Sequence, residues 1–460
     1  MAAGAAAAES GVLRYVEESG DAAVAVAEDI WAYAELGYLE EKSTRRLQEF
    51  LNDRGFAIES GIAGMPTAFL ASRGSGKPVI GILAEFDALP GLSQAAVPHR
   101  QPRVADAPGH ACGHHLFGAA SALAAAGVAD WLEETGAEGT VRLYGTPAEE
   151  GGSGKVYMTR AGLFDDVDVV LHWHPSDRND ASPSSSNANK SGRFRFHGIA
   201  AHAASAPDRG RSALDGVEAM NFMANLMREH VPSDSRIHYV ITDGGDAPNI
   251  VPEFAEVYYY VRNPDPEVVK RLFERVADAA RAAAMGTGTR MEYEVMHGNY
   301  PVLPNEVLAR QVDANLRKLG GIEYSPGEQA FAETVHATLV EPSLSLGSEG
   351  RVQPYVYRQR MGSTDVGDVS WNVPTVGFGT ATWVPGTAAH SWQAVAAGGM
   401  SIGHKGMLLA ARLLAMTAAD LYSNPALIER AWNELKERRG PDFEYSALLG
   451  NREPPLDYRL

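Results

Sequence analysis

The amino-terminal part of the chain carries apolar residues at helical spacing. The positions that recur in this way are Ile30, Tyr33, Leu36, Leu47, Phe50 and Leu51. Residues three or four positions apart lie on one face of a helix, and the stretch Asn52–Gly55 supplies a stop signal. The pattern therefore predicts helical structure over Asp21–Asn52.

Short apolar runs rich in β-branched residues follow, and each ends in Gly, Pro or an acidic residue. These runs are Pro78–Leu83, Gly139–Tyr144 and Val167–Leu171. Between the first two lies the Ala-rich segment Leu116–Leu132, which has the length and composition of a helix. Because strands alternate with helices here, we predict an α/β layer built on a mostly parallel central sheet.

The middle of the chain predicts a separate unit. Its composition changes first at Pro175–Asn189, where Ser, Asn and Asp dominate, and we interpret this stretch as a linker or exposed loop. Strand, helix, strand, strand, helix and strand are then predicted at Gly192–Gly198, Ser212–Glu229, Arg236–Thr242, Glu253–Val261, Pro266–Met285 and Thr289–Met296. This order is that of a ferredoxin-like α+β unit. We therefore expect an inserted domain.

The α/β layer is predicted to resume after the inserted domain. The segments that indicate this are a helix at Asn305–Leu319, a strand at Pro374–Gly379 and a long helix at Met400–Asp420. The expected division is a first part of the α/β domain at 1–189, an inserted domain at 190–300 and a second part of the α/β domain at 301–460.

Composition and charge exclude several kinds of partner. The 460 residues are 45% apolar and 21% charged, which is typical of a globular chain. Because 40 basic residues face 58 acidic ones, for a formal charge of −18, we expect no nucleic acid or anionic membrane as partner. One cysteine, Cys112, permits no intrachain disulfide. The first residues have neither the basic nor the Leu-rich region of a secretory signal, so we expect a cytoplasmic location.

Residues with metal-binding side chains follow the predicted strands. They are Glu85 and Asp87, Glu149 and Glu150, His172 and His174, and, after a loop, His390. His110, Cys112 and His114 precede the Ala-rich helix and share one face if the backbone there is extended. Open α/β sheets build their sites at the carboxyl ends of strands, so we expect these groups to converge. Thiolate, imidazole and carboxylate together suit zinc or manganese.

Structural roles compete with this interpretation. A lone buried cysteine usually packs in a core, and adjacent glutamates such as Glu149 and Glu150 are usually solvated. The flanking histidines of Cys112 favour a site, and so do the Pro turn before Glu149 and the glycines after Glu150. The isolated histidines His238, His297, His336 and His404 are expected to be structural.

Three motifs resemble those of the aminoacylase/carboxypeptidase metallopeptidase family. They are Pro108-Gly109-His110-Ala111-Cys112-Gly113-His114, Pro147-Ala148-Glu149-Glu150-Gly151-Gly152 and Ala201-His202-Ala203-Ala204. The resemblance extends from Ile30 to His390 and is strongest to the amidohydrolase branch of auxin-conjugate, hippurate and p-aminobenzoyl-glutamate hydrolases. Trp173-His174-Pro175 and the segment Ala84–Gly91 are similar to the p-aminobenzoyl-glutamate hydrolase side of that branch.

The resemblance assigns roles to individual residues. It implies that a pair of divalent ions, manganese or zinc, is bound by Cys112, His114, Glu150, His174 and His390. Glu149 matches the general base, and Asp87 matches a carboxylate that orients a ligand. His202 matches a histidine that reaches across a homodimer into the partner's site, and Asn249 and Arg262 match positions that hold the substrate's free carboxylate.

Three positions depart from the family pattern. His115 stands where many relatives have Asp or Asn, which alters a contact behind the ligands. Glu85 stands where two-zinc peptidases place a histidine ligand, so it is either a ligand or a neighbour. His172 competes with His174, and we prefer His174 because it directly precedes Pro175, as the acidic ligand of relatives does.

The predicted activity is hydrolysis of the amide bond of N-acyl amino acids, with an aromatic acyl or p-aminobenzoyl group favoured by the resemblance. Two bound ions would activate a water, Glu149 would move its proton, and His202 would donate a hydrogen bond to the oxyanion. The alternatives are a dipeptidase or carboxypeptidase of the same family and a noncatalytic metal-binding protein of this fold. A noncatalytic protein would have little need for Glu149, because it activates no water.

Overall fold

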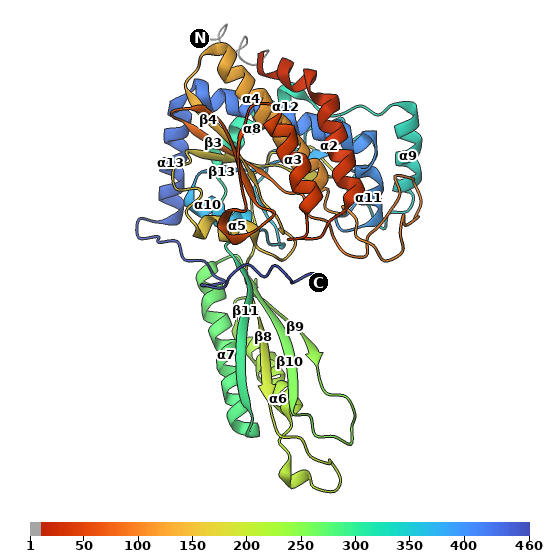
Figure 1. Cartoon of the computed structure of the whole chain (residues 1–460), viewed down its shortest axis with the longest axis vertical. Helices are drawn as coiled ribbons and strands as arrows, with labels where there is room; N and C mark the ends of the chain where they lie inside the picture. The colour runs from red at the N-terminus through yellow and green to blue at the C-terminus, as the bar shows by residue number, and fades with distance from the viewer. Residues whose placement is uncertain (1–10) are drawn as a thin grey trace.

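The computed structural model describes residues 11–460, and it consists of an α/β domain with a smaller elongated domain projecting from one end (Figure 1). The chain enters the projecting domain through β8 and returns through β11, so this domain is an insertion in the α/β domain. The predicted fold class, a mostly parallel α/β catalytic domain with an inserted ferredoxin-like domain, is confirmed.

The central sheet has six strands in the order β1-β2-β4-β3-β5-β13. Their bounds are Ala57–Ser60 (β1), Phe69–Ser75 (β2), Val79–Ala84 (β3), Gly139–Gly145 (β4), Val169–Leu171 (β5) and Thr375–Val376 (β13). The strands β4, β3, β5 and β13 run parallel, whereas β1 and β2 add an antiparallel edge. All six residues of β3 are buried because it lies in the middle of the sheet, covered on both faces.

Helices cover this sheet and position its loops. They are α2 (Gly20–Tyr33), α3 (Glu41–Asn52), α4 (His114–Thr135), α5 (Gly154–Arg160), α8 (Glu306–Leu319), α9 (Pro326–His336), α10 (Val366–Asn372), α11 (Trp392–Gly398), α12 (Ser401–Ser423) and α13 (Pro425–Arg439). Short strand pairs join β6 (His174–Ser176) to β14 (Gly379–Ala381) and β7 (Ser184–Ser185) to β12 (Arg358–Gln359). Single turns of 3-10 helix occur at η1 (Ile62–Gly64), η2 (Pro207–Arg209) and η3 (Arg228–His230).

The helix α4 lies at the centre of the domain, against β3, β4 and α12. Among the described residues it is the one helix long and apolar enough to cross a membrane, but 94% of its apolar window is buried inside the protein. Its many Ala and Gly residues let neighbouring elements approach closely. At Gly118, for example, a Cβ atom would collide with the backbone carbonyl of Glu85. The helix therefore fixes the backbone beside the predicted metal ligands.

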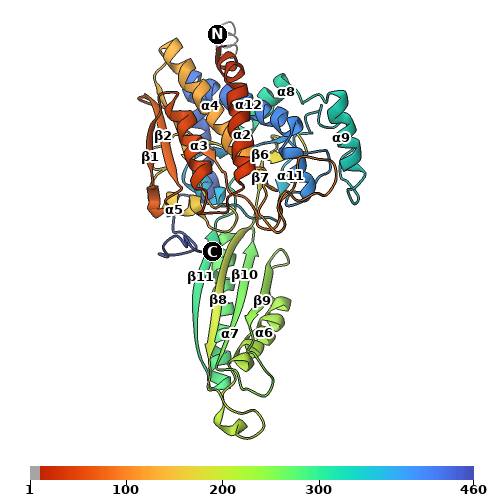
Figure 2. The ribbon, with the colours of Figure 1, turned by 45° about the vertical axis from the view of Figure 1, so that its right-hand side comes forward.

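The inserted domain follows the predicted β-α-β-β-α-β order. Its elements are β8 (Ala188–His197), α6 (Ala213–Met227), β9 (Arg236–Asp243), β10 (Phe254–Asn263), α7 (Pro266–Thr287) and β11 (Arg290–Asn299). The four strands form an antiparallel sheet in the order β11-β8-β10-β9, and α6 and α7 pack side by side on one face (Figure 2). We propose residues 190–300 as the inserted domain; its first strand, β8, begins at Ala188.

The opening segment is helical as predicted, but it forms two helices, because Ala34 has a left-handed backbone with φ of 47° that ends α2, and Leu36 pairs with Ala88. One local prediction is wrong. The segment Pro175–Asn189 is no exposed linker, since most of its residues are buried. Its polar side chains bond to buried backbone; Asn179, for instance, donates to the carbonyl of Glu349 over 2.7 Å.

Candidate active site

The carboxyl ends of three parallel strands deliver the predicted acidic and imidazole groups to one place. β3 leads into Glu85 and Asp87, β4 leads through Pro147 to Glu149 and Glu150, and β5 leads to His174. Because the ends of parallel strands meet at one edge of the sheet, residues distant in sequence become neighbours there.

Asp87 orients two elements of this cluster. Its Oδ1 lies 2.8 Å from Nδ1 of His114, and its Oδ2 accepts a hydrogen bond of 2.9 Å from the backbone N–H of Glu150. Burial alone lowers the pKa of His114, but Cys112, Asp87 and Glu85 raise it well above its ordinary value. His114 therefore stands in a strongly negative setting, with Nδ1 held and Nε2 directed to Glu85 Oε2 at 3.1 Å.

Cys112 and His174 lie together beside His114. The Cys112 Sγ is 3.5 Å from Nε2 of His174, and Nδ1 of His174 lies 2.8 Å from the carbonyl of Pro175. That carbonyl can only accept, so Nδ1 carries the proton and Nε2 keeps its lone pair. Burial lowers the pKa of His174 to about 3, which keeps the imidazole neutral as a metal ligand must be.

His390 reaches the cluster from a loop after β14. Its backbone has φ of 61°, and its N–H donates to the carbonyl of Ala111 over 2.9 Å. The imidazole Nε2 lies 3.1 Å from Oε1 of Glu150, and this contact raises the pKa of His390. The strained backbone thus turns the side chain toward Glu150.

The donor atoms fit divalent ions. Three overlapping groups have ligand atoms within 4.8 Å of one another: Cys112, His114 and His174; Cys112, Glu150 and His390; and Glu85, His114 and Glu149. Three of the atoms concerned, Glu85 Oε2, His114 Nε2 and Glu150 Oε1, form no regular hydrogen bond, and their close contacts are with other members of the cluster. Buried polar atoms left in this way are costly unless they bind something, and sulfur, imidazole and carboxylate donors suit zinc-like ions.

Glu149 lies beside the same donors. Burial, together with the carboxylates of Glu85 and Glu150, raises its pKa well above the ordinary value. A carboxylate that holds a proton readily at the edge of a metal cluster has the properties of a general base that later acts as an acid.

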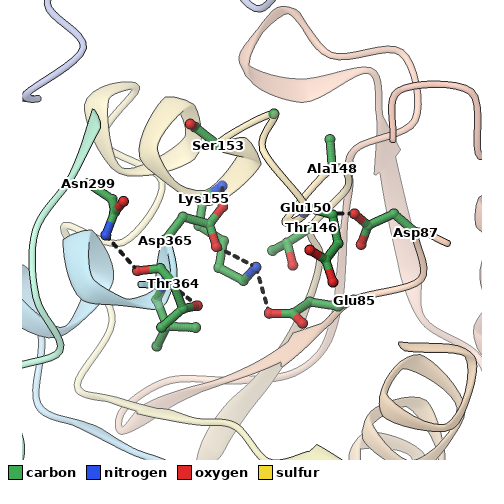
Figure 3. Close-up of polar contacts among 12 residues, drawn as sticks. Glu85, Asp87, Thr146, Ala148, Glu150, Ser153, Lys155, Asn299, Thr364 and Asp365 are labelled. Atoms are coloured by element: carbon green, nitrogen blue, oxygen red, sulfur yellow. Dashed lines mark hydrogen bonds and ion pairs between the residues drawn. The ribbon is translucent and has the colours of Figure 1, made fainter. Parts of the chain in front are cut away.

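A buried lysine balances the acidic groups beneath Glu149. Nζ of Lys155, on α5, lies 2.7 Å from Oε1 of Glu85 and 2.8 Å from Oδ1 of Asp365, and Figure 3 shows its side chain reaching between the two carboxylates. Oδ2 of Asp365 accepts from the backbone N–H of Lys155 over 2.9 Å. The network ties Glu85 to the loop before α10.

A cavity of about 540 Å³ opens between the two domains beside Glu149. From the catalytic domain it is lined by Glu149, Glu150, Asp365 and His390, and from the inserted domain by Arg193, Tyr258, Tyr260, Arg262 and His297. The segment after α13 supplies Arg452, Pro455, Tyr458 and Arg459. The volume suits a small-molecule substrate.

The structure separates the three predicted residues of the inserted domain. Arg262, at the end of β10 near the catalytic domain, lines the cavity. His202 and Asn249 are exposed in the loops after β8 and β9, at the opposite end of the domain (Figure 1). There the carbonyl of Asn249 accepts from the N–H of Ala203, and His202 pairs with Ile250. Within one chain, His202 and Asn249 do not meet the metal cluster.

Three neighbouring histidines, His110, His115 and His172, lie outside the ligand groups. The backbone at 110–113 turns rather than extends, since Gly113 has φ of 77°, and His110 lies 3.0 Å from the carbonyl of Ile30, away from Cys112. His115 lies 3.0 Å from the carbonyl of Gly398. His172 packs against Gly377, where a side chain would collide with it, and belongs to none of the three ligand groups.

The structure also brings to the site residues that the sequence pattern does not reveal. His297, expected to be an isolated structural histidine, lines the cavity, contacts Ser153 and lies 2.9 Å from Oδ1 of Asn299. A feature of the sequence could have revealed Lys155, because it is a charged residue among apolar ones at the start of the helix that begins at Gly154. No feature of the sequence points to the cavity residues Tyr458 and Arg459.

The fold and the donor cluster are those of a metallopeptidase-type hydrolase with an inserted domain. Residues 186–287 match the peptidase dimerisation domain. The chain is 40% identical to one of the subunits of the p-aminobenzoyl-glutamate hydrolase of Escherichia coli, over 89% of this chain and 91% of that protein. It is 32% identical to Xaa-Arg dipeptidase of Mus musculus, over 92% of this chain and 90% of that protein.

A solved structure shares the fold. A dinuclear metal-binding peptidase of the M20 family from Bacillus subtilis superposes with a TM-score of 0.60 at 18% identity, covering 88% of this chain and 99% of that one. The chain belongs to the M20 family of metallopeptidases. It is a hydrolase of amide bonds, as its named relatives are.

Proposed function

We propose that this enzyme hydrolyses the amide bond of N-acyl amino acids, of the aromatic acyl or p-aminobenzoyl-glutamate type. The observation that carries the proposal is the position of Glu149, beside a cluster of metal donors that face one another and on the wall of a cavity that also contains Arg262. The relative with 40% identity is named for p-aminobenzoyl-glutamate.

Two divalent ions, manganese or zinc, would be held by Cys112, His114, Glu150, His174 and His390. When bound, they supply an acidified water and polarise the scissile carbonyl. Glu149 accepts the water's proton and delivers it to the departing amine nitrogen. Asp87 keeps His114 and the backbone of Glu150 in place while this happens. Arg262 receives the free carboxylate of the amino acid.

The proposal includes a homodimer through the inserted domain, because His202 and Asn249 lie in the loops after β8 and β9, at the end of that domain opposite Arg262 and the cavity. The N–H groups of Ala204 and Ser205 donate to Nδ1 of His202 over 3.2 and 3.1 Å, which leaves the proton on Nε2. His202 is therefore prepared to donate from Nε2 to an oxyanion in the partner's site. A cytoplasmic location is part of the same proposal.

A panel of substrates tests the proposal. Benzoyl- and p-aminobenzoyl-amino acids are compared with unblocked dipeptides, each with added manganese or zinc, on protein whose metal has been removed and restored. We expect the blocked amino acids to have the higher kcat/KM. A preference for dipeptides would assign the chain to the dipeptidase alternative, and metal binding without turnover of either class would assign it to the noncatalytic one.

A further inference from the structure

The cavity beside Glu149 contains several arginines in addition to its acidic residues. Four arginines line it, Arg193, Arg262, Arg452 and Arg459, although the chain has a formal charge of −18. Arginines gathered in a cleft focus the local field and attract anions. A substrate ending in arginine, the class in the name of the mouse relative, is disfavoured by the same field.

Two of the four arginines already have acidic partners. Nη1 of Arg193 lies 2.6 Å from Oε1 of Glu256, and Nη2 of Arg452 lies 2.8 Å from Oε1 of Glu294. Arg195 shares both carboxylates, and these ion pairs fix the positions of Arg193 and Arg452.

Arg262 and Arg459, in contrast, have no acidic partner. Within residues 11–460, neither forms an ion pair, and Nε of each is buried without a hydrogen-bond partner. Arg262 stacks over the ring of Tyr260 at 5.3 Å and Arg459 over the ring of Tyr458 at 4.7 Å. A half-buried guanidinium with free N–H groups and no counterion is a receptor for a carboxylate.

Arg459 is also fixed relative to the reacting groups. Its Nη2 donates to the backbone carbonyl of Glu150 over 2.5 Å, and the hydroxyl of Tyr458 donates to the same oxygen over 3.2 Å. Tyr458 in turn packs edge-on against Tyr38 with 5.6 Å between ring centres. An anion bound by Arg459 is therefore held at a set position from Glu149 and Glu150.

We propose that Arg459 binds a second substrate carboxylate, the side-chain carboxylate of an acidic amino acid, while Arg262 holds the α-carboxylate. This inference rests on the proposed function for the reaction itself and adds a specificity-determining residue to it. It narrows the released amino acid to aspartate or glutamate. Since one guanidinium can bind one carboxylate, two arginines without acidic partners in one cavity suit a ligand with two carboxylates.

The test compares N-benzoyl-glutamate with N-benzoyl-glutamine, which differ only by the charge of the side chain. We expect the wild-type enzyme to favour the glutamate compound at least tenfold in kcat/KM. Arg459→Gln keeps a donor for the Glu150 carbonyl but loses the charge. It should remove most of this preference by raising KM for the glutamate compound, while Arg459→Lys retains part of it. Arg452→Gln, whose arginine already has a partner, should leave the ratio unchanged.

The outcomes separate this inference from the proposed function. An equal loss on both compounds would make Arg459 only a positioning residue for Glu150 and overturn the inference, as would a wild-type enzyme that does not distinguish them. If only dipeptides are cleaved, the proposed function fails, and the pair Ala-Glu and Ala-Gln still tests Arg459. Binding of free glutamate and of free glutamine, measured by calorimetry, gives the same comparison without turnover. If wild type and Arg459→Gln bind glutamate with equal affinity, the inference is contradicted.

Discussion

Lys155 and Glu85 form a fully buried ion pair, with 2.7 Å between Nζ and Oε1, at the position where the sequence departs from the two-zinc pattern of the family. Nearby charges decide the protonation of this lysine: although burial lowers its pKa, Asp365 and Glu85 raise it above the ordinary value. Glu85 is thus paired with a cation of the chain itself, next to the site proposed to hold metal ions.

Replacing Lys155 by Met should destabilise the fold, because Glu85 and Asp365 would remain buried without a counterion. Removing one member of such a pair costs about 3–5 kcal/mol, measured as the free energy of unfolding in urea. Lys270→Met, which removes an exposed pair with Glu267, is the control and should change stability by less than about 1 kcal/mol. Equal effects of the two changes would contradict the importance assigned to the buried network.

Glu149→Gln should abolish turnover while the protein keeps its metal. The amide has the shape of the carboxylate but cannot accept the water's proton, and losses of roughly 10²–10⁴-fold in kcat are typical for such a group. Metal content by atomic spectroscopy and kcat on a blocked amino acid are measured together. A variant with near wild-type kcat would show that the base is another residue.

Cys112→Ser should instead lower the metal content. Cys112 belongs both to the ligand group that contains His174 and to the one that contains His390, and a hydroxyl is a much poorer ligand than a thiolate. Burial raises the pKa of the free thiol, so the ion must displace its proton and binding should weaken as the pH falls. Full metal occupancy in the serine variant would remove Cys112 from the site.

The sequence predicted those parts of the site that follow strand ends, and it failed where the chain turns or where distant segments meet. Glu149, Glu150 and His174 could be found because parallel strands end at a shared edge. The prediction that His110 shares a face with Cys112 assumes an extended backbone. The turn at Gly113 instead directs the His110 side chain to the carbonyl of Ile30.

Polar composition was also misleading. The segment Pro175–Asn189 resembles a linker in composition, yet Asn179 is fully buried: it donates to Glu349 and accepts from the N–H of Ala381 over 2.9 Å. Lys155 meets Asp365 across 210 positions, and Arg459 meets Glu150 across 309. No local period encodes pairings at such separations, so only the folded structure reveals them.

Asp368, on α10, should make stability depend on pH. Burial raises the pKa of this carboxyl from its ordinary value of 3.8 to about 7, although Tyr445 and the N–H of Tyr300 donate to it. Between about pH 4 and 7 the folded chain keeps a proton that the unfolded chain has lost, so this group lowers stability as the pH rises.

Asp368→Asn removes the titration and preserves both contacts, because the amide oxygen accepts from Tyr300 and the amide nitrogen donates to Tyr445. The difference in Tm, variant minus wild type, should therefore grow from pH 4 to 7 and level off above. A difference that stays constant over that range would contradict the assigned pKa.

Sharing of residues between subunits can be tested by mixing two inactive variants. His202→Ala should fold and bind metal but lose roughly 10²–10³-fold in kcat, because its contact forms as the oxyanion develops. Glu149→Gln is inactive for a different reason. In a mixed dimer, the subunit that keeps Glu149 receives His202 from its partner, so one site of the two is complete.

A one-to-one mixture that exchanges freely should therefore recover roughly a quarter of wild-type activity, since half of the dimers are mixed and each has one complete site. The matched control mixes His202→Ala with the double variant His202→Ala/Glu149→Gln, in which no pairing restores a site. Recovery in the first mixture alone would establish that His202 acts across the dimer. If exchange is demonstrated by mass and no activity returns, His202 does not act in the partner's site, and its exposed position at the far end of the inserted domain would also exclude it from its own chain's cavity.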